Sequence, residues 1–235
     1  MTALERIDYH DGATALTGWL ARPVGAARAA IAVFPTIMNK TPAVEAKAQA
    51  LAQAGYLAFI ADYYGEPVAD FAASQVLSQQ LVRDTDGFRT RLLTALEVFD
   101  ELEESRDLPR LAIGFCMGGM AVLDLARAGA DLLGVVSFHG LLDTTRPANA
   151  PIKPRILVCH GDADSLVPRS QVLSFWEEMD RVGANWHFHS YSGVRHGYTN
   201  PNPPPAGGPI AFDSSADRQS WTAMQSFFDE ILTAD

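Results

Sequence analysis

The chain has 235 residues, of which 48% are hydrophobic and 20% are charged, and this suffices for one large core in one or two domains. Its net charge of −10 argues against a nucleic-acid partner, because no cluster of lysines and arginines is present to displace phosphate counterions. The two cysteines, Cys116 and Cys159, provide neither a disulfide framework nor a four-ligand zinc site.

The start of the chain, MTALERIDYHDG, has no basic segment followed by an apolar one, so it does not resemble a secretory signal. No later apolar run approaches the length that a bilayer-spanning helix needs. We therefore expect a soluble cytoplasmic protein with no membrane partner.

The first elements of the chain are a hairpin, a buried strand and a helix. Two short strands with an Asp-Gly turn are predicted within residues 5–23, and the apolar run 29–35 predicts the buried strand. Residues 41–55 predict a helix with both ends marked, because Thr41 suits the N-cap and Gly55 the stop.

The rest of the chain continues to alternate buried strands with helices. Strands are predicted at 56–62, 108–115, 132–140, 155–162 and 186–191, and helices at about 70–82, 85–104, 116–129, 167–183 and 213–234. This alternation indicates an α/β fold with a mainly parallel, twisted sheet and helices on both faces. We predict a single domain over residues 1–235, with ligands bound at the carboxyl ends of the strands.

The hexapeptide GFCMGG, residues 114–119, places a cysteine between two glycines where a strand is predicted to turn into a helix. A nucleophile at the apex of such a turn needs small neighbours, and Gly114 and Gly118 provide them around Cys116. The start of the helix also favours a thiolate and lowers the thiol pKa. The alternative is that Cys116 is a small buried hydrophobic residue at a glycine-rich helix start.

An acidic turn follows the predicted strand at 155–162. It carries Asp162 and Asp164, and a carboxylate at such a strand end can orient a catalytic histidine. We expect Asp162 to form an Asx-turn or to cap the next helix. Cys159, inside the strand, is expected to be part of the core.

His196 lies in a loop after the last predicted strand, within SGVRHGYTNP, where a general base could reach the edge of the sheet. His139 and His160 close strands, and we expect both to be structural histidines with satisfied hydrogen bonds. The resulting order of nucleophile, acid and base, 116, 164 and 196, is that of the α/β-hydrolase fold.

On these motifs, together with FIADYYG after the second buried strand, the chain resembles the dienelactone hydrolase family over nearly its full length. The resemblance implies Cys116 as nucleophile, Asp164 as acid and His196 as base. It also implies that the backbone N–H groups of Ile37 and Met117 form the oxyanion hole.

The resemblance also indicates a substrate pocket, for which Thr36, Tyr64 and Tyr198 are candidates, although tyrosines at such positions often serve packing instead. Thr36 occupies the position where well-studied members of the family carry a glutamate near the resting nucleophile. Those members hold a substrate carboxylate with arginines, and the residues in the corresponding region are Arg83, Arg89 and Arg91.

The expected activity is hydrolysis of a small activated ester or lactone through a covalent acyl-enzyme, with no metal or organic cofactor. A thioesterase or an acyltransferase on the same fold is the closest alternative, because the acceptor is chosen by the shape of the cleft. An alternative of another class is a redox-sensing thiol protein without catalytic activity.

Overall fold

The computed structural model describes residues 3–203 and 208–233. The chain divides into two compact units, Met1–Ala112 and Ile113–Asp235, and each is described by itself. The prediction of a single domain stays a prediction. No helix in the described part of the chain is long and apolar enough to cross a membrane.

The first unit contains four strands in the spatial order β1-β2-β4-β3. Their bounds are β1 (Leu4–Asp11), β2 (Thr14–Ala21), β3 (Ala30–Phe34) and β4 (Leu57–Ile60). β1 and β2 form the predicted antiparallel hairpin, β2 pairs antiparallel with β4, and β4 pairs parallel with β3. Every residue of β3 and β4 is buried, so these strands form the centre of this unit.

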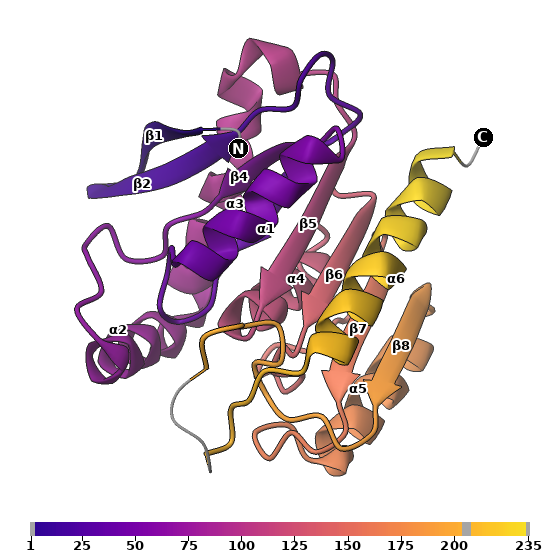
Figure 1. Cartoon of the computed structure of the whole chain (residues 1–235). Coiled ribbons are helices and arrows are strands. Elements are labelled where there is room, and N and C mark those ends of the chain that lie inside the picture. The colour runs from indigo at the N-terminus through magenta and orange to yellow at the C-terminus, as the bar shows by residue number, and fades with distance from the viewer. Residues whose placement is uncertain (1–2, 204–207, 234–235) are drawn as a thin grey trace. The chain divides into compact units, whose positions relative to one another are not determined.

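Three helices and a short 3-10 turn complete the first unit: α1 (Pro42–Gln53), α2 (Phe71–Arg83), α3 (Thr85–Glu101) and η1 (Glu103–Ser105). The predicted start and stop of α1 are confirmed, because the Thr41 side chain accepts from the N–H of Val44 and Gly55 has a φ of 90°. The helix predicted to reach residue 104 ends at Glu101 and gives way to η1. Figure 1 shows α1 in front of the strands and α3 behind them.

The second unit begins within β5 (Arg110–Phe115), which is followed in space by β6 (Gly134–Phe138), β7 (Arg155–Gly161) and β8 (Trp186–Tyr191). β6, β7 and β8 pair in parallel. The helices are α4 (Met117–Arg127), α5 (Arg169–Arg181) and α6 (Ser214–Thr233). Figure 1 shows α6 in front of β6 and β7, with α5 behind. These elements match the predicted ones closely.

A buried ion pair attaches the long loop 141–154 to helix α5. Arg127 donates to the carboxylate of Glu178 at 2.7 Å and to the carbonyl of Leu142 at 3.1 Å. Glu178 also accepts from the N–H of Ala148 at 2.8 Å. Burial opposes ionisation of Glu178, but the hydrogen bond and charge of Arg127 prevail and hold the pKa of this carboxyl below its usual value. The buried ion pair between Arg127 and Glu178 therefore holds the loop against α5.

Breaking this pair is expected to destabilise the protein. Glu178→Ala leaves the Arg127 guanidinium buried without its partner, which lowers the free energy of unfolding by about 3–5 kcal/mol in urea denaturation at pH 7. The matched control is Glu177→Ala, an exposed neighbour on the same helix. Because the folded-state pKa of Glu178 is lowered, the stabilisation is present above pH 4.5 and is lost as the pH falls through the folded-state pKa. Equal stability of the two variants at pH 7 contradicts this prediction.

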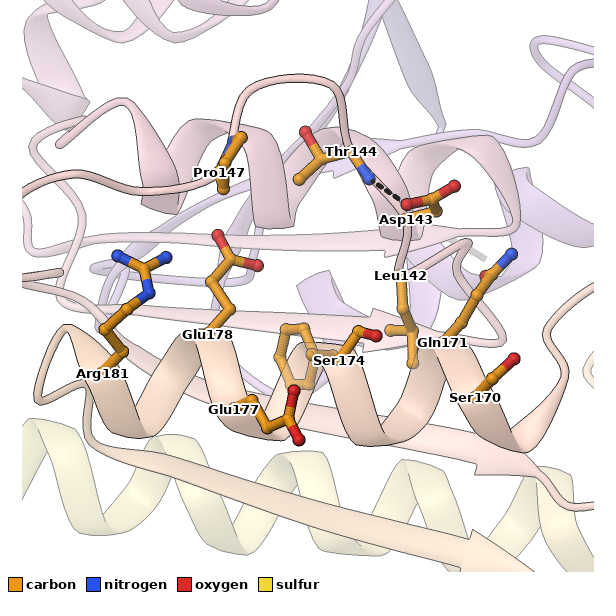
Figure 2. Close-up of a pocket in the computed structure, with 11 residues that line it drawn as sticks. Leu142, Asp143, Thr144, Pro147, Ser170, Gln171, Ser174, Glu177, Glu178 and Arg181 are labelled. Atoms are coloured by element: carbon orange, nitrogen blue, oxygen red, sulfur yellow. Dashed lines mark hydrogen bonds between the residues drawn. The ribbon is translucent and has the colours of Figure 1, made fainter.

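The same loop and α5 enclose a cavity of about 460 Å³. Figure 2 shows Glu178 and Arg181 extending from α5 toward the overlying loop. The residues that line the cavity are Leu142, Asp143, Thr144, Pro147, Ser170, Gln171, Ser174, Phe175, Glu177, Glu178 and Arg181. Cys116, Asp164 and His196 are not among them, so this cavity is not the candidate site.

Candidate active site

Cys116 occupies a strained turn between β5 and α4. Its φ of 56° and ψ of −115° lie in a region that residues other than glycine rarely adopt. A Cβ atom at Gly114 would lie 1.8 Å from the carbonyl oxygen of Gly118, so no larger residue fits at position 114. The steric requirement predicted for this turn is confirmed at Gly114.

The backbone of this turn is held from the end of β6. The N–H of Cys116 is shared between the carbonyl of Phe138, at 3.0 Å, and the Nδ1 of His139, at 3.1 Å. The Cys116 side chain is half-buried and stands immediately before Met117, the first residue of α4. The N–H groups of a first helical turn have no partners within the helix and favour an anion. The thiol therefore lies at the N-terminal end of α4.

Asp164 and His196 form a buried pair. The Nδ1 of His196 lies 2.7 Å from the Oδ2 of Asp164, and the other carboxylate oxygen accepts from the N–H of Leu166 at 2.8 Å. His196 and Asp164 are 1% and 3% exposed. A carboxylate beside Nδ1 fixes the ring proton on that nitrogen, so the lone pair of a neutral ring is on Nε2.

The Cys116 thiol acts on the same histidine ring. Burial alone would lower the pKa of His196, but hydrogen bonding to Asp164 and Cys116 and the charges of both groups raise it to about 10. The buried Nε2 atom has no partner of normal hydrogen-bond geometry among the described residues. Contacts between nucleophile and base are often long before substrate binds and shorten in the complex. The three predicted residues are thus neighbours.

The loop that carries His196 is clamped by a later segment of the chain. The carbonyl of His196 accepts from the N–H of Ala211 at 3.1 Å, and His196 forms an isolated bridge with Ile210. At Gly197, where φ is 68°, a Cβ atom would lie 2.8 Å from the Ile210 side chain. The glycine after the histidine is therefore required both by backbone conformation and by space.

The second acid of the turn has a different task. Asp162 pairs with Arg169, with N–O distances of 3.1 and 2.7 Å. Of its two predicted roles, an Asx-turn or a cap on the next helix, the cap is wrong, because α5 has no side-chain cap. Cys159 is fully buried, as predicted, and burial raises the pKa of its thiol to about 12.

The two histidines that close strands differ from one another. His139 has partners on both ring nitrogens, the N–H of Cys116 and the hydroxyl of Thr199. Neither ring nitrogen of His160 has a hydrogen-bond partner in the described part of the chain, so the prediction of a satisfied histidine is wrong there. His160 packs against Phe188 instead, and burial lowers its pKa, which keeps the ring neutral.

Tyr198 has the packing role that the sequence left open. It is fully buried, and its hydroxyl donates to the carbonyl of Cys159 at 3.2 Å. Thr199 is also buried, at the position where its hydroxyl meets the Nε2 of His139 at 2.9 Å. The link between His139, Thr199 and Cys116 is not among the contacts predicted from the sequence. The available signal was that the strands before Cys116 and His139 are both expected to end at the same edge of the sheet.

In the first unit, the loop after β3 carries Thr36 and Ile37. The hydroxyl of Tyr63 donates to the carbonyl of Pro35, and the hydroxyl of Tyr64 donates to the carbonyl of Ile37, both at 3.0 Å. These two tyrosines therefore hold the backbone of the loop. The Thr36 hydroxyl accepts from the N–H of Met38 at 3.2 Å, inside the same loop.

Tyr64 also lines a hollow of about 480 Å³ in the first unit, together with Arg91. Arg91 donates to the Asp11 carboxylate, the Thr14 hydroxyl and the Tyr63 carbonyl. Because its guanidinium donates to these protein acceptors, Arg91 is not available in this structure for a bidentate hydrogen bond to a substrate carboxylate.

The fold and the turn around Cys116 define the class of protein: the chain is an α/β-hydrolase, the class in which a strained strand-to-helix turn presents the nucleophile. A model of the dienelactone hydrolase family matches residues 16–232. The chain therefore belongs to the dienelactone hydrolase family, and it is a hydrolase of the carboxylic ester and lactone class.

Proteins similar to the chain agree with this assignment. The solved structure of m3DLH is 32% identical, with 98% of each chain covered and a TM-score of 0.91. A protein from metagenomic libraries, described as the dienelactone hydrolase-like promiscuous phosphotriesterase P91, is 31% identical with 98% of each chain covered and a TM-score of 0.89. A probable 2-oxo-3-(5-oxofuran-2-ylidene)propanoate lactonase of Bradyrhizobium sp is 28% identical over 83% of this chain and 84% of the relative.

Proposed function

We propose that the chain hydrolyses a small activated ester or lactone through a covalent acyl-enzyme on Cys116. His196 acts as general acid and base, and Asp164 orients it. One observation carries the proposal: the buried His196 ring pairs with Asp164 at 2.7 Å through Nδ1, while Cys116 helps to raise its pKa. These contacts are what a nucleophile, base and orienting acid require.

In the first half-reaction, the Cys116 thiolate attacks the carbonyl carbon and forms a carbon–sulfur bond. The bond from this carbon to the leaving oxygen then breaks, and the Nε2–H of the His196 imidazolium gives its proton to the departing alkoxide. The products are a thioester on Cys116, the free alcohol and a neutral His196. From a lactone, the alcohol stays attached to the acyl group.

In the second half-reaction, the neutral His196 accepts a proton from water, and the resulting hydroxide attacks the thioester carbonyl. The carbon–sulfur bond breaks, the carboxylic acid leaves, and the pair of thiolate and imidazolium is restored. Asp164 accepts the hydrogen bond from Nδ1–H of His196 throughout and stabilises the imidazolium. No step requires a metal ion or an organic cofactor.

The developing oxyanion needs preorganised donors, each of which is worth about 3–4 kcal/mol of transition-state stabilisation. We assign this role to the backbone N–H group of Met117, and Ile37 as the second donor stays a prediction of the family resemblance. Support for Met117 comes from its place as the first residue of α4. Ile37 lies in the loop after β3 in the first unit, where its carbonyl accepts from the hydroxyl of Tyr64.

Phosphotriester hydrolysis is a second candidate activity, supported by the 31% identity to the relative described as a promiscuous phosphotriesterase. Cys116 would attack phosphorus, displace an aryloxide and leave a phosphorylated cysteine, which water activated by His196 would then cleave. A thioesterase or acyltransferase would use the same acyl-enzyme with a different substrate or acceptor.

The test is to trap the intermediate. Mixing the protein with p-nitrophenyl acetate at pH 7 should release a burst of p-nitrophenolate approaching one equivalent per chain when deacylation is slow, followed by steady turnover. Mass spectrometry of the quenched protein should find an acetyl group on the peptide that contains Cys116. Turnover without a burst, and with an adduct on no residue or on Cys159, contradicts the proposed intermediate.

A substrate panel then separates the candidate activities. Lactones, enol esters, thioesters and aryl phosphotriesters are compared by kcat/KM, and acyl transfer is measured as ester formed in the presence of added alcohol. The proposed function predicts the highest values for lactones or enol esters, with free acid as the main product. A preference for thioesters, or ester as the main product, would assign the alternative activity.

A further inference from the structure

We propose that His139 is a positioning residue for the reaction, a neutral imidazole that ties the turn of the nucleophile to the loop of the base. The inference rests on the proposed function of Cys116 and His196. It concerns a residue outside the proposed triad, at the end of β6.

The backbone of His139 is strained. Its φ is 42°, and Asn39, Cys116 and His139 are the residues other than glycine with positive φ in ranges 3–203 and 208–233. Such a conformation costs free energy and persists only where the surroundings enforce it, most often at functional sites. The ring of His139 is 1% exposed, so this strain serves an interior contact.

The hydrogen bonds of the ring determine its protonation state. The N–H of Cys116 donates to Nδ1 at 3.1 Å, and an N–H can only donate, so Nδ1 carries no proton. The ring proton is therefore on Nε2, which lies 2.9 Å from the hydroxyl oxygen of Thr199 and donates to it. In a doubly protonated ring, the Nδ1–H of His139 would point at the N–H of Cys116, and two donors would face each other. The geometry thus selects one tautomer of the neutral ring.

The ring also packs against the loop of the base. Its centroid lies 5.2 Å from that of His196 and 5.1 Å from that of Tyr198, with interplanar angles of 72° and 78°. With the bond to Thr199, His139 contacts three residues of the segment 196–199. It therefore links that segment to the backbone of Cys116, although the two lie 80 residues apart in sequence.

This link has a defined task in the proposed reaction. The N–H of Cys116 already has the carbonyl of Phe138 as an acceptor at 3.0 Å, so the Nδ1 of His139 is not needed merely to satisfy a buried donor. Its effect is to set the distance and direction between Cys116 and His196. A displacement of about 1 Å between reacting groups can cost about 10²-fold in rate.

Two pairs of variants test the inference. His139→Asn keeps an oxygen acceptor at the place of Nδ1 and tolerates the left-handed backbone, whereas His139→Leu removes both polar atoms. Thr199→Ser keeps the acceptor for Nε2, whereas Thr199→Val removes it with little change in shape. The measurements are kcat and KM for p-nitrophenyl acetate, the rate of Cys116 alkylation by iodoacetamide at pH 7, and the midpoint of thermal unfolding.

We expect His139→Leu to lower kcat by about 10- to 100-fold with KM nearly unchanged, and Thr199→Val to lower it less. His139→Asn and Thr199→Ser should recover most of kcat, and by more than any difference in thermal midpoint from their partners accounts for. If Asn and Leu lose kcat equally, or if losses in kcat simply follow the loss of thermal stability in both pairs, His139 is a packing residue and the inference is wrong.

The alkylation rate separates this inference from the proposed function. Alkylation depends on the relative positions of Cys116 and His196 but needs no substrate. His139→Leu should therefore lower the alkylation rate and His139→Asn should restore it, even if the natural substrate is not an ester. If the Cys116→Ala variant hydrolyses p-nitrophenyl acetate as fast as the wild-type protein, the proposed function is contradicted instead. Unchanged alkylation in His139→Leu contradicts the role of His139.

Discussion

Cys116→Ala and His196→Gln are each expected to lower kcat for p-nitrophenyl acetate by about 10⁴-fold or more. The reason is that nucleophile and base act as one unit: without His196 the thiolate loses its counterion and its source of activated water, and without Cys116 no acyl-enzyme forms. The double variant should therefore be no slower than the slower single variant. Steady-state hydrolysis at pH 7 measures all three.

The matched control is Cys159→Ala. Cys159 is the other cysteine, is fully buried, and has a thiol whose pKa burial raises to about 12, so it supplies no thiolate at neutral pH. This variant should keep the activity of the wild type. Activity that survives Cys116→Ala but disappears in Cys159→Ala would overturn the proposed mechanism, and so would losses in the two single variants that multiply in the double variant.

Asp164→Asn should produce the second large effect, a loss of about 10³- to 10⁴-fold in kcat together with a change in pH dependence. Burial alone would lower the pKa of His196, and Asp164 and Cys116 raise it to about 10. Without the carboxylate the pKa falls. The protonated His196 ring is the acid that protonates the leaving alkoxide, so kcat falls as the pH rises through the pKa of His196. Because this pKa is lower in Asp164→Asn, the fall in kcat should occur at lower pH in the variant.

The measurement is kcat from pH 5 to 11 with an alkyl ester or lactone, whose leaving group needs a proton. Asp162→Asn is the matched control, because Asp162 lies in the same turn but pairs with Arg169 instead of His196. Its profile should match that of the wild type. If the fall in kcat at alkaline pH occurs at the same pH in Asp164→Asn as in the wild type, or shifts equally in both variants, Asp164 does not raise the pKa of the catalytic acid.

Much of the fold was predictable because the relevant interactions are local. The N-cap at Thr41 and the left-handed Gly55 involve atoms within a few residues of one another, so residue type alone indicates where α1 begins and ends. The requirement for glycine at 114 is of the same kind, since the atom that excludes a side chain belongs to Gly118, four residues on. The sequence by itself therefore determined the strand order along the chain and the cysteine turn.

Only the tertiary structure decided which side chains meet. Asp162 and Asp164 stand two residues apart in one turn, and packing turns one toward Arg169 and the other toward His196. Tyr198, a pocket candidate by sequence, is enclosed with its hydroxyl on Cys159. His139 and His160 look alike at the ends of two strands, yet one ring binds Cys116 and Thr199 while the other packs on Phe188. The physical reason is that the environment of a buried polar group depends on residues distant in sequence, and no local pattern encodes it.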